Sequence, residues 1–214
     1  MSEPTNAPRD REPDTGETLS ELYRFVSGVL ADPPSAAAIE EFQAGAIPEP
    51  DGLPPGALRE GFGSLREWAD GVEAPAEAAA ELEREHTRLF VGPRPSLQVH
   101  ESYYADDYLG EPLAAVKGTY AGLGIQPSED LKEEADHAAV ELAALSVLSR
   151  REGESPDDKR LFLRDHGWWL PELAADLRDS ADSQFYRAIA DVLDGLVRFD
   201  AERFEVGLES SSNP

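Results

Sequence analysis

Apolar residues recur every three or four positions along most of this 214-residue chain, and this spacing places them on one face of an α-helix. The repeating segments are separated by proline and glycine, which end helices and start loops. Nowhere do two segments alternate apolar and polar residues on either side of a hairpin turn. The sequence therefore predicts an all-α fold, a single-domain irregular bundle of about eight to ten helices.

Capping signals predict where individual helices begin. The Thr18-x-x-Glu21 pattern is typical of a capping box at the start of the first helix, and Ser35 is expected to cap a short second one. A longer helix is expected from Ser128 to about Arg150, because acidic residues fill its first turn and basic residues its last. Further helices are expected around residues 58–71, 75–90, 112–123, 161–163, 170–177 and 185–204.

The two ends of the chain lack this periodicity. We expect residues 1–17 to form a disordered acidic tail, residues 18–207 to form the helical domain and residues 208–214 to fray. The first residues carry no apolar stretch of the kind found in secretory signals, and no apolar run approaches the length of a membrane span. We therefore expect a cytoplasmic protein with no membrane span.

Acidic residues outnumber basic ones by 44 to 19, which gives a formal net charge of -25. Such a chain repels phosphate backbones and anionic lipid, so nucleic acid is not an expected partner. The acidic residues are spread along the whole chain, and their mutual repulsion would strain a compact fold in dilute buffer. Molar salt removes most of this repulsion by shortening the Debye length to about 3 Å. We interpret the composition as that of a protein from a salt-adapted, haloarchaeal-like organism.

Residues that usually carry catalysis or hold metals are sparse. The chain has no cysteine, which excludes disulfides and thiolate chemistry. Ser102 follows Glu101 but lacks the glycine-flanked turn that exposes a nucleophilic serine. No two histidines have the spacing that places a pair of metal ligands on one helix face. We therefore expect no catalytic residue, metal or cofactor. The histidines are His86, His100, His137 and His166.

The stretch 85–104 resembles neither an ordinary helix nor an ordinary linker. A helix ending in Leu89 and Phe90 runs into a loop that two prolines stiffen. Stiff loops that carry apolar groups are frequent binding sites. We expect one of Leu89 and Phe90 to lie in the core and the other to line a groove. The neighbouring Trp168 and Trp169 cannot both face one core, so one of them is expected at an edge or in a cleft.

Two motifs about fifty residues apart stand out along the chain. The first is His-Thr-Arg-Leu-Phe at 86–90, followed by Gly-Pro at 92–93 and Glu-Ser-Tyr-Tyr at 101–104. The second is Glu-Glu-Ala-Asp-His at 133–137. Together they resemble a known family, the TorD/DmsD/NarJ-like maturation chaperones of molybdenum oxidoreductases. The resemblance covers about residues 18–205 and implies an all-helical chaperone that is not an enzyme. Its implied partners are the apo catalytic subunit of a molybdoenzyme and the twin-arginine leader of that subunit, which it would hold until cofactor insertion.

The resemblance also implies which residues form or support the leader-binding groove. One wall would come from the loop motif, and the opposite wall from a helix bearing the Asp-His pair. The implied residues are Leu89, Phe90, Pro93, Asp136 and His137, with Tyr103, Tyr104 and Trp169 nearby.

Two alternatives remain open at this point. A helical metal-dependent hydrolase could use two Asp-His pairs, Asp136 with His137 and Asp165 with His166. A permanent structural subunit of a reductase complex is the other. The sequence also leaves open which reductase is the client and whether the protein is a monomer or a dimer.

Overall fold

The computed structural model describes residues 15–92, 94–126 and 133–208. Within these ranges the chain forms ten α-helices, three short π or 3-10 segments and no β-strand, which confirms the predicted all-α bundle. None of the helices in the described ranges is long and apolar enough to cross a bilayer. The helices are α1 Thr15–Ala31, α2 Ala36–Glu41, α3 Ala57–Gly71, α4 Pro75–His86, α5 Glu101–Tyr104, α6 Glu111–Gly122, α7 Ala138–Arg151, α8 Pro156–His166, α9 Leu170–Ser180 and α10 Gln184–Arg203. The short segments are Phe42–Ala46, Pro50–Gly52 and Thr87–Val91.

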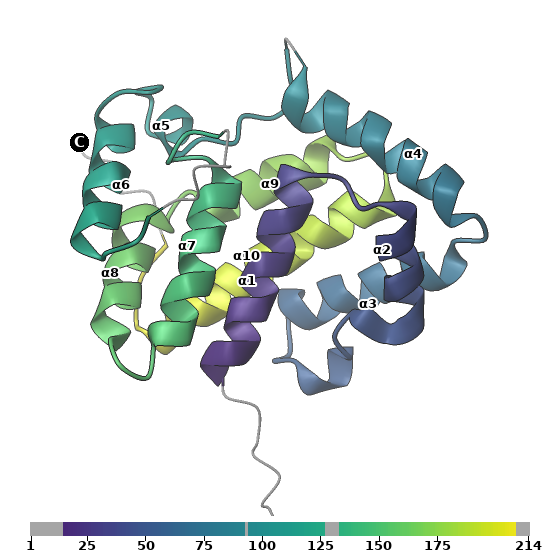
Figure 1. Cartoon of the computed structure of the whole chain (residues 1–214), viewed down its shortest axis with the longest axis horizontal. Helices are drawn as coiled ribbons and strands as arrows, with labels where there is room; N and C mark the ends of the chain where they lie inside the picture. The colour runs from purple at the N-terminus through teal and green to yellow at the C-terminus, as the bar shows by residue number, and fades with distance from the viewer. Residues whose placement is uncertain (1–14, 93, 127–132, 209–214) are drawn as a thin grey trace, which may run out of the picture.

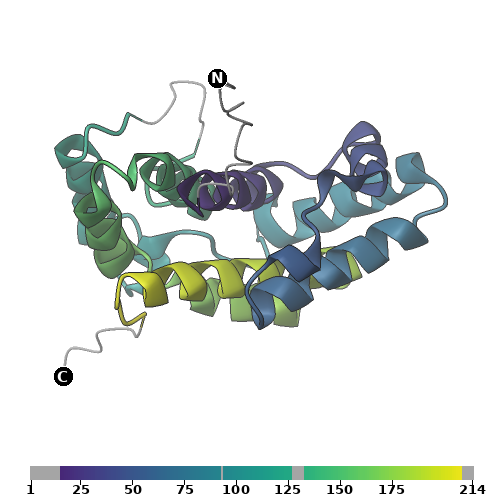
Figure 2. The same ribbon diagram turned by 90° about the horizontal axis from the view of Figure 1, so that it is seen from below.

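The helices form two layers around one hydrophobic core. Helices α1 and α7 lie side by side in one layer, and α3, α9 and α10 form the other (Figure 1, Figure 2). Helices α6 and α8 close one end of the bundle, while α2 and α4 pack together at the other (Figure 1). Large side chains that are fully buried fill the space between the layers, among them Tyr23, Phe62, Phe162, Trp169, Phe185 and Tyr186.

Two glycines allow α3 and α10 to approach closely. A Cβ atom on Gly61 would lie only 2.7 Å from the backbone nitrogen of Val192, and one on Gly195 would collide with the backbone of Leu58. Glycine weakens an isolated helix by about 1 kcal/mol relative to alanine. Here the missing side chain is what lets the two helix backbones meet, so packing supports a helix that its own sequence disfavours.

Most helix boundaries agree with the sequence signals. Ser35 caps α2 as predicted, because its side chain accepts a hydrogen bond of 3.2 Å from the backbone N–H of Ala38. The first helix, however, begins at Thr15 and not at Thr18, so the predicted capping box is wrong. Gly16 is buried, and packing of this first turn extends the helix by three residues. Of the predicted tails at 1–17 and 208–214, residues 1–14 and 209–214 lie outside the described residues, and residues 15–17 belong to α1.

Helix α7 begins ten residues later than predicted. Its N-cap is His137, whose Nδ1 accepts a hydrogen bond of 3.1 Å from the N–H of Ala139. His137 has an extended backbone and forms an isolated β-bridge with His100. This pairing occupies the backbone just before the helix, and the predicted start at Ser128 lies outside the described residues. Asp136 and His137 therefore lie on the turn before α7 and not on its side, which corrects the expected helical wall.

A buried ion network joins α1, α8 and α10. The fully buried Nζ of Lys159 lies 2.7 Å from Oδ2 of Asp200 and 3.1 Å from Oε2 of Glu152. The hydroxyl of Tyr23 donates to the same Asp200 oxygen at 2.9 Å. Because each buried charge has a partner, the network avoids the cost of an isolated ion. No local pattern in the sequence predicted it.

Candidate functional site

The chain between Thr87–Val91 and α5 borders an open groove, here called the loop groove, with a volume of about 590 Å³. The segment crosses the molecule between the end of α4 and α5 (Figure 1). Apolar and aromatic side chains dominate the lining, with two polar residues among them. The lining residues are Phe90, Gly92, Pro95, Leu97, Gln98, Val99, His100, Tyr103 and Tyr108.

Exposed hydrophobic side chains gather around the loop groove. In the described part of the chain five large hydrophobic residues are exposed, and four of them lie on the segments that border the groove. Their exposed fractions are 60% for Val91, 48% for Tyr103, 56% for Tyr108 and 45% for Leu109. A concentration of exposed apolar surface on an otherwise acidic protein is typical of an interaction site.

Residues 97–100 line the groove and are held by backbone hydrogen bonds to two neighbouring segments. The N–H of Leu97 donates to the carbonyl of Leu89 at 3.0 Å, and the carbonyl of Val99 accepts from Ala138 at 2.8 Å. Leu97 and Val99 are buried, whereas Gln98 and His100 between and after them are half-buried. This alternation has the period of a β-strand, and it places Leu97 and Val99 on the more buried face and Gln98 and His100 on the less buried one.

A buried carboxylate organises the turn below the groove. Asp136 is fully buried, and its two oxygens accept hydrogen bonds from Nδ1 of His100 at 3.1 Å and from Oγ of Ser102 at 2.5 Å. Burial alone would raise the pKa of Asp136, but the hydrogen bonds from His100 and Ser102 outweigh it and lower the pKa to about 2. The carboxylate is therefore ionised and fully engaged inside the protein.

Ser102 connects this carboxylate to residues 105–110, here called the tyrosine loop. Besides donating to Asp136, the Ser102 hydroxyl accepts a hydrogen bond of 3.0 Å from the N–H of Leu109. Leu109 has a φ of 58°, a conformation that a branched side chain rarely adopts without support. The chain Asp136–Ser102–Leu109 thus fixes the loop that displays Tyr108 at the groove.

Ring contacts through two histidines connect the start of α7 to Tyr108 at the groove. The His137 ring contacts the His100 ring edge-on at 5.3 Å, and His100 contacts Tyr108 in the same way at 5.7 Å. Burial and the neighbouring His100 lower the pKa of His137 to about 4, so its imidazole is neutral near neutral pH. Only the neutral ring can accept the hydrogen bond from Ala139 that caps α7.

Two tryptophans are anchored by buried carboxyl groups behind the groove. Nε1 of Trp169 donates to Glu141 at 2.9 Å, and Nε1 of Trp168 donates to Glu101 at 3.2 Å. Burial, together with the nearby Glu101, raises the pKa of Glu141 well above its usual range. Glu101 also bonds to the ring of His166 at 2.9 Å. These contacts lock α5 against α7, α8 and the start of α9.

The predicted site residues fall into three groups. One of Leu89 and Phe90 was expected in the core and the other at a groove; Leu89 is fully buried and Phe90 lines the loop groove. Tyr103 also lines the groove. Asp136 and His137 lie beneath the groove as supports and not on its surface. Trp169, expected near the groove, is fully buried in the core, and of the tryptophan pair it is Trp168 that is half-buried.

The remaining predicted residues take other positions. Tyr104 is half-buried, and its hydroxyl donates to Asp176 at 2.9 Å behind the groove. Pro93 lies outside the described residues. Sequence reasoning missed His100 and Tyr108. For His100 the available signal was the short alternation of apolar and polar residues at 97–100, but four residues are too few to identify a strand with no hairpin partner.

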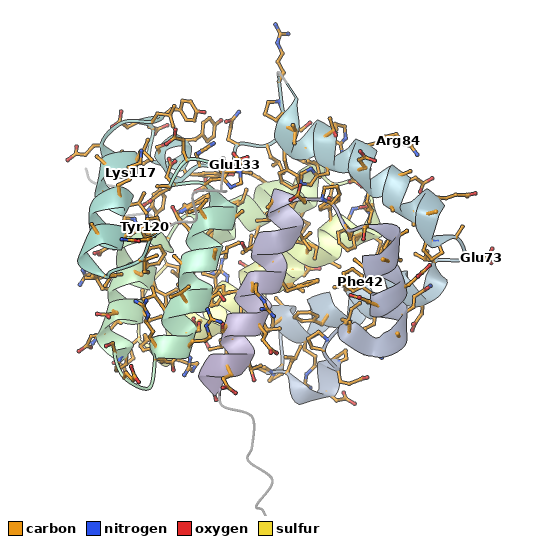
Figure 3. The ribbon with its side chains drawn as sticks, viewed as in Figure 1. Phe42, Glu73, Arg84, Lys117, Tyr120 and Glu133 are labelled. Atoms are coloured by element: carbon orange, nitrogen blue, oxygen red, sulfur yellow. The ribbon has the colours of Figure 1, made fainter. Side chains whose placement is uncertain are left out.

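A second hollow lies away from the loop groove. Lys117, Tyr120 and Glu133 lie together at one end of the bundle (Figure 3) and line a hollow of about 420 Å³.

The residues of the hydrolase alternative are engaged with separate partners. Asp165 pairs with Arg164, and the ring of His166 bonds to Glu101 and Thr119, so the two Asp-His pairs do not form one site. Over the described ranges, no group of three His, Asp or Glu side chains is placed to hold a metal.

Known proteins resemble this chain across the site and beyond it. The family model described as nitrate reductase delta subunit matches residues 54–175, a range that includes the groove and its supports. Chaperone protein TorD of Vibrio parahaemolyticus serotype O3:K6 is 26% identical over 205 residues, which cover 86% of this chain and 94% of that protein. Chaperone protein TorD of Salmonella paratyphi B is 32% identical over 103 residues, 45% of this chain and 49% of that protein. Because the family match spans more than half of the chain, the protein belongs to the nitrate reductase delta subunit family.

Proposed function

We propose that this protein is a cytoplasmic maturation chaperone for a molybdenum oxidoreductase. Its loop groove binds the twin-arginine leader of the apo catalytic subunit and holds that subunit until its cofactor is inserted. The observation that carries the proposal is the cluster of exposed hydrophobic side chains around an open groove, in a chain whose relatives are named chaperone proteins. The expected action is binding and release, with no chemical step.

The chemistry of the groove suits such a leader. An apolar stretch can bury its side chains against Phe90, Tyr103 and Tyr108, which contributes about 25 cal/mol for each Å² removed from water. The exposed Asp106 and Asp107 on the tyrosine loop offer carboxylates to the two arginines. In molar salt, long-range attraction is screened, so the apolar contacts should dominate the affinity.

Asp136 has a different role from the one its motif suggested. Its carboxylate is enclosed and bonded to His100 and Ser102, so it acts as a positioning residue for the tyrosine loop. The arginines of the leader would contact Asp106 and Asp107 and the ring faces of the exposed tyrosines, where cation–π contact is available. A surface adapted to salt agrees with the net charge of -25.

A capture experiment tests the function directly. The tagged chain is expressed in its salt-grown source cells, and bound proteins are identified by mass spectrometry. We expect the precursor of one molybdoenzyme, without its cofactor and with its leader intact. The matched control is the same precursor with only the leader deleted, which should no longer be captured. Equal capture of both forms would refute leader binding. Recovery of the mature, cofactor-loaded enzyme would instead support a permanent subunit.

A further inference from the structure

One of the buried carboxyl groups behind the loop groove has an incomplete set of hydrogen bonds. Glu141 of α7 is fully buried, and Nε1 of Trp169 donates to its Oε2 at 2.9 Å. Its other oxygen, Oε1, is also buried and receives no hydrogen bond from the described part of the chain. An ionised carboxylate in this position would be costly, because burial removes the water that would otherwise hydrate it.

The neighbouring carboxyl group of Glu101 can bond to Glu141 only through a proton. Both oxygens of Glu101 already have partners, Nε1 of Trp168 at 3.2 Å and Nδ1 of His166 at 2.9 Å. Two ionised carboxylates both accept hydrogen bonds, and neither can donate one. Burial, the charge of Glu101 and a hydrogen bond to Glu101 raise the pKa of Glu141 well above its usual range, and they outweigh the bond from Trp169.

We infer that Glu141 is a positioning residue for the leader site, and that it acts as a neutral acid whose proton bridges it to Glu101. This inference rests on the proposed function and adds a further residue to the machinery of the groove. Glu101 is the first residue of α5, and its N–H donates to the carbonyl of Asp136 at 2.9 Å. Fixing its side chain therefore fixes the short helix that carries Ser102 and Tyr103.

Two other ionisable groups lie near this pair. Asp136, on the turn before α7, is negatively charged and raises the pKa of Glu141 further. Tyr120 of α6 donates its hydroxyl to the carbonyl of Ala135 at 3.1 Å, and it stays neutral because burial raises its pKa. Neither group supplies positive charge, so both favour the neutral form of Glu141 or leave it unaffected.

Helices α1 and α8 also pack against α7. The buried ionisable side chains that they contribute are Tyr23, Lys159 and His166. Tyr23 and Lys159 both bond to Asp200, and His166 bonds to Glu101. Because these three side chains are engaged with other partners, a proton is what neutralises Glu141.

Loss of this proton would place two negative carboxylates beside each other in the core. Their repulsion is strong in a region of low dielectric and would push α5 away from α7. Ser102 follows Glu101 and holds the tyrosine loop through the N–H of Leu109, and Tyr103 lines the groove. Leader binding should therefore depend on the protonation of a residue that does not itself line the groove.

Infrared difference spectroscopy tests the proton directly. The spectrum of Glu141→Gln is subtracted from that of the wild type, with both full chains in molar KCl at neutral pH. We expect the carbonyl stretch of a protonated carboxylic acid in the wild type and its loss in the variant. Glu154→Gln, at an exposed glutamate, is the matched control and should leave this band unchanged. A difference that contains only the bands of an ionised carboxylate would overturn the inference, whether or not the leader binds.

Titration of the leader tests the positioning role. The probe is a synthetic peptide with two adjacent arginines followed by an apolar stretch of about ten residues, titrated into the full chain in molar KCl. Glu141→Leu cannot hydrogen-bond to Glu101 and should weaken binding at least about tenfold. Glu141→Gln can accept from Trp169 and donate to Glu101, so it should rescue binding to within about twofold of the wild type. Gly61→Ala disturbs the contact between α3 and α10, and its unchanged binding would separate positioning from a general loss of stability.

The outcomes separate the inference from the function beneath it. Equal binding by the folded leucine and glutamine variants would overturn the positioning role, and an equal loss in both would show that the charge of Glu141 is needed and not its proton. If Glu141→Leu does not fold, the pH profile decides. Above the pH at which the infrared band fades, the wild type should lose affinity about tenfold per pH unit and Glu141→Gln should not, whereas parallel profiles would overturn the role. A peptide that fails to bind the wild type would overturn the proposed function, while the infrared band still decides whether Glu141 holds the proton.

Discussion

Replacing His137 by asparagine should make the fold less sensitive to acid. His137 caps α7 through a bond from the Ala139 N–H that only a neutral imidazole can accept. Asparagine is among the strongest N-cap residues and does not titrate. The substitution therefore keeps a cap and removes a proton-binding site from the folded protein.

The size of the effect follows from the pKa of His137, which burial and His100 lower from 6.5 to about 4. Because the folded pKa is lowered, the unfolded chain binds a proton first as the pH falls. The stability that the neutral ring contributes is present above about pH 6.5 and is lost as the pH falls toward 4. Between about pH 7.5 and about pH 5 this linkage amounts to about 2 kcal/mol.

Urea unfolding at a series of pH values measures this loss. The three tryptophans report the transition, and KCl is held constant to fix the screening of the other charges. His86, whose pKa burial also lowers, is present in both proteins, so its contribution cancels in the difference. We expect wild type and His137→Asn to be similar at about pH 7.5 and to differ by about 2 kcal/mol at about pH 5, in favour of the variant. Parallel curves within about 0.5 kcal/mol would refute the role of His137 as a neutral cap.

Three further predictions concern packing and the groove. Gly61→Ala should destabilise the fold by about 2 kcal/mol because its Cβ would collide with α10. Gly63→Ala has open space and should stabilise the fold by up to about 1 kcal/mol, and thermal melts that rank the two the other way would contradict the close packing. Lys159→Met should cost about 3 kcal/mol in urea unfolding because it leaves Asp200 buried without its cation, and adding Asp200→Asn should recover part of this; no recovery would show that the two are not coupled. Ser102→Ala should speed hydrogen exchange in the tyrosine loop and weaken leader binding about tenfold while helix content stays constant; unchanged exchange would count against its role as a link.

Helices with strong local signals were predictable from the sequence. Ser35 caps α2 where its spacing from the apolar residues indicated, and α3 ends at Gly71 as expected. Local signals failed where a distant contact competes with them. The bridge between His100 and His137 sets the start of α7, and nothing near His137 in the sequence reveals a partner so far along the chain.

The position of the groove could be predicted in part, because some of its features are local in the sequence and others depend on distant contacts. The stiff loop after Phe90 pointed to the region where the structure has a groove, because prolines and neighbouring apolar residues are local features of the sequence. The burial of Asp136 and Trp169 depends on how α5, α7 and α9 meet, which no pattern in a single sequence specifies. Tyr108 was missed because its exposure comes from a loop conformation that Ser102 stabilises from outside the loop.

Calorimetric titration of the twin-arginine leader in molar KCl tests the central claim most directly. The wild type should bind with a negative heat-capacity change, the mark of apolar burial. A Tyr103→Ser, Tyr108→Ser double variant should bind at least about tenfold more weakly. Leu161→Ser removes an exposed hydrophobic side chain that does not line the groove and should bind as the wild type does. Undiminished binding by the folded double variant would contradict the assignment of the loop groove as the leader site.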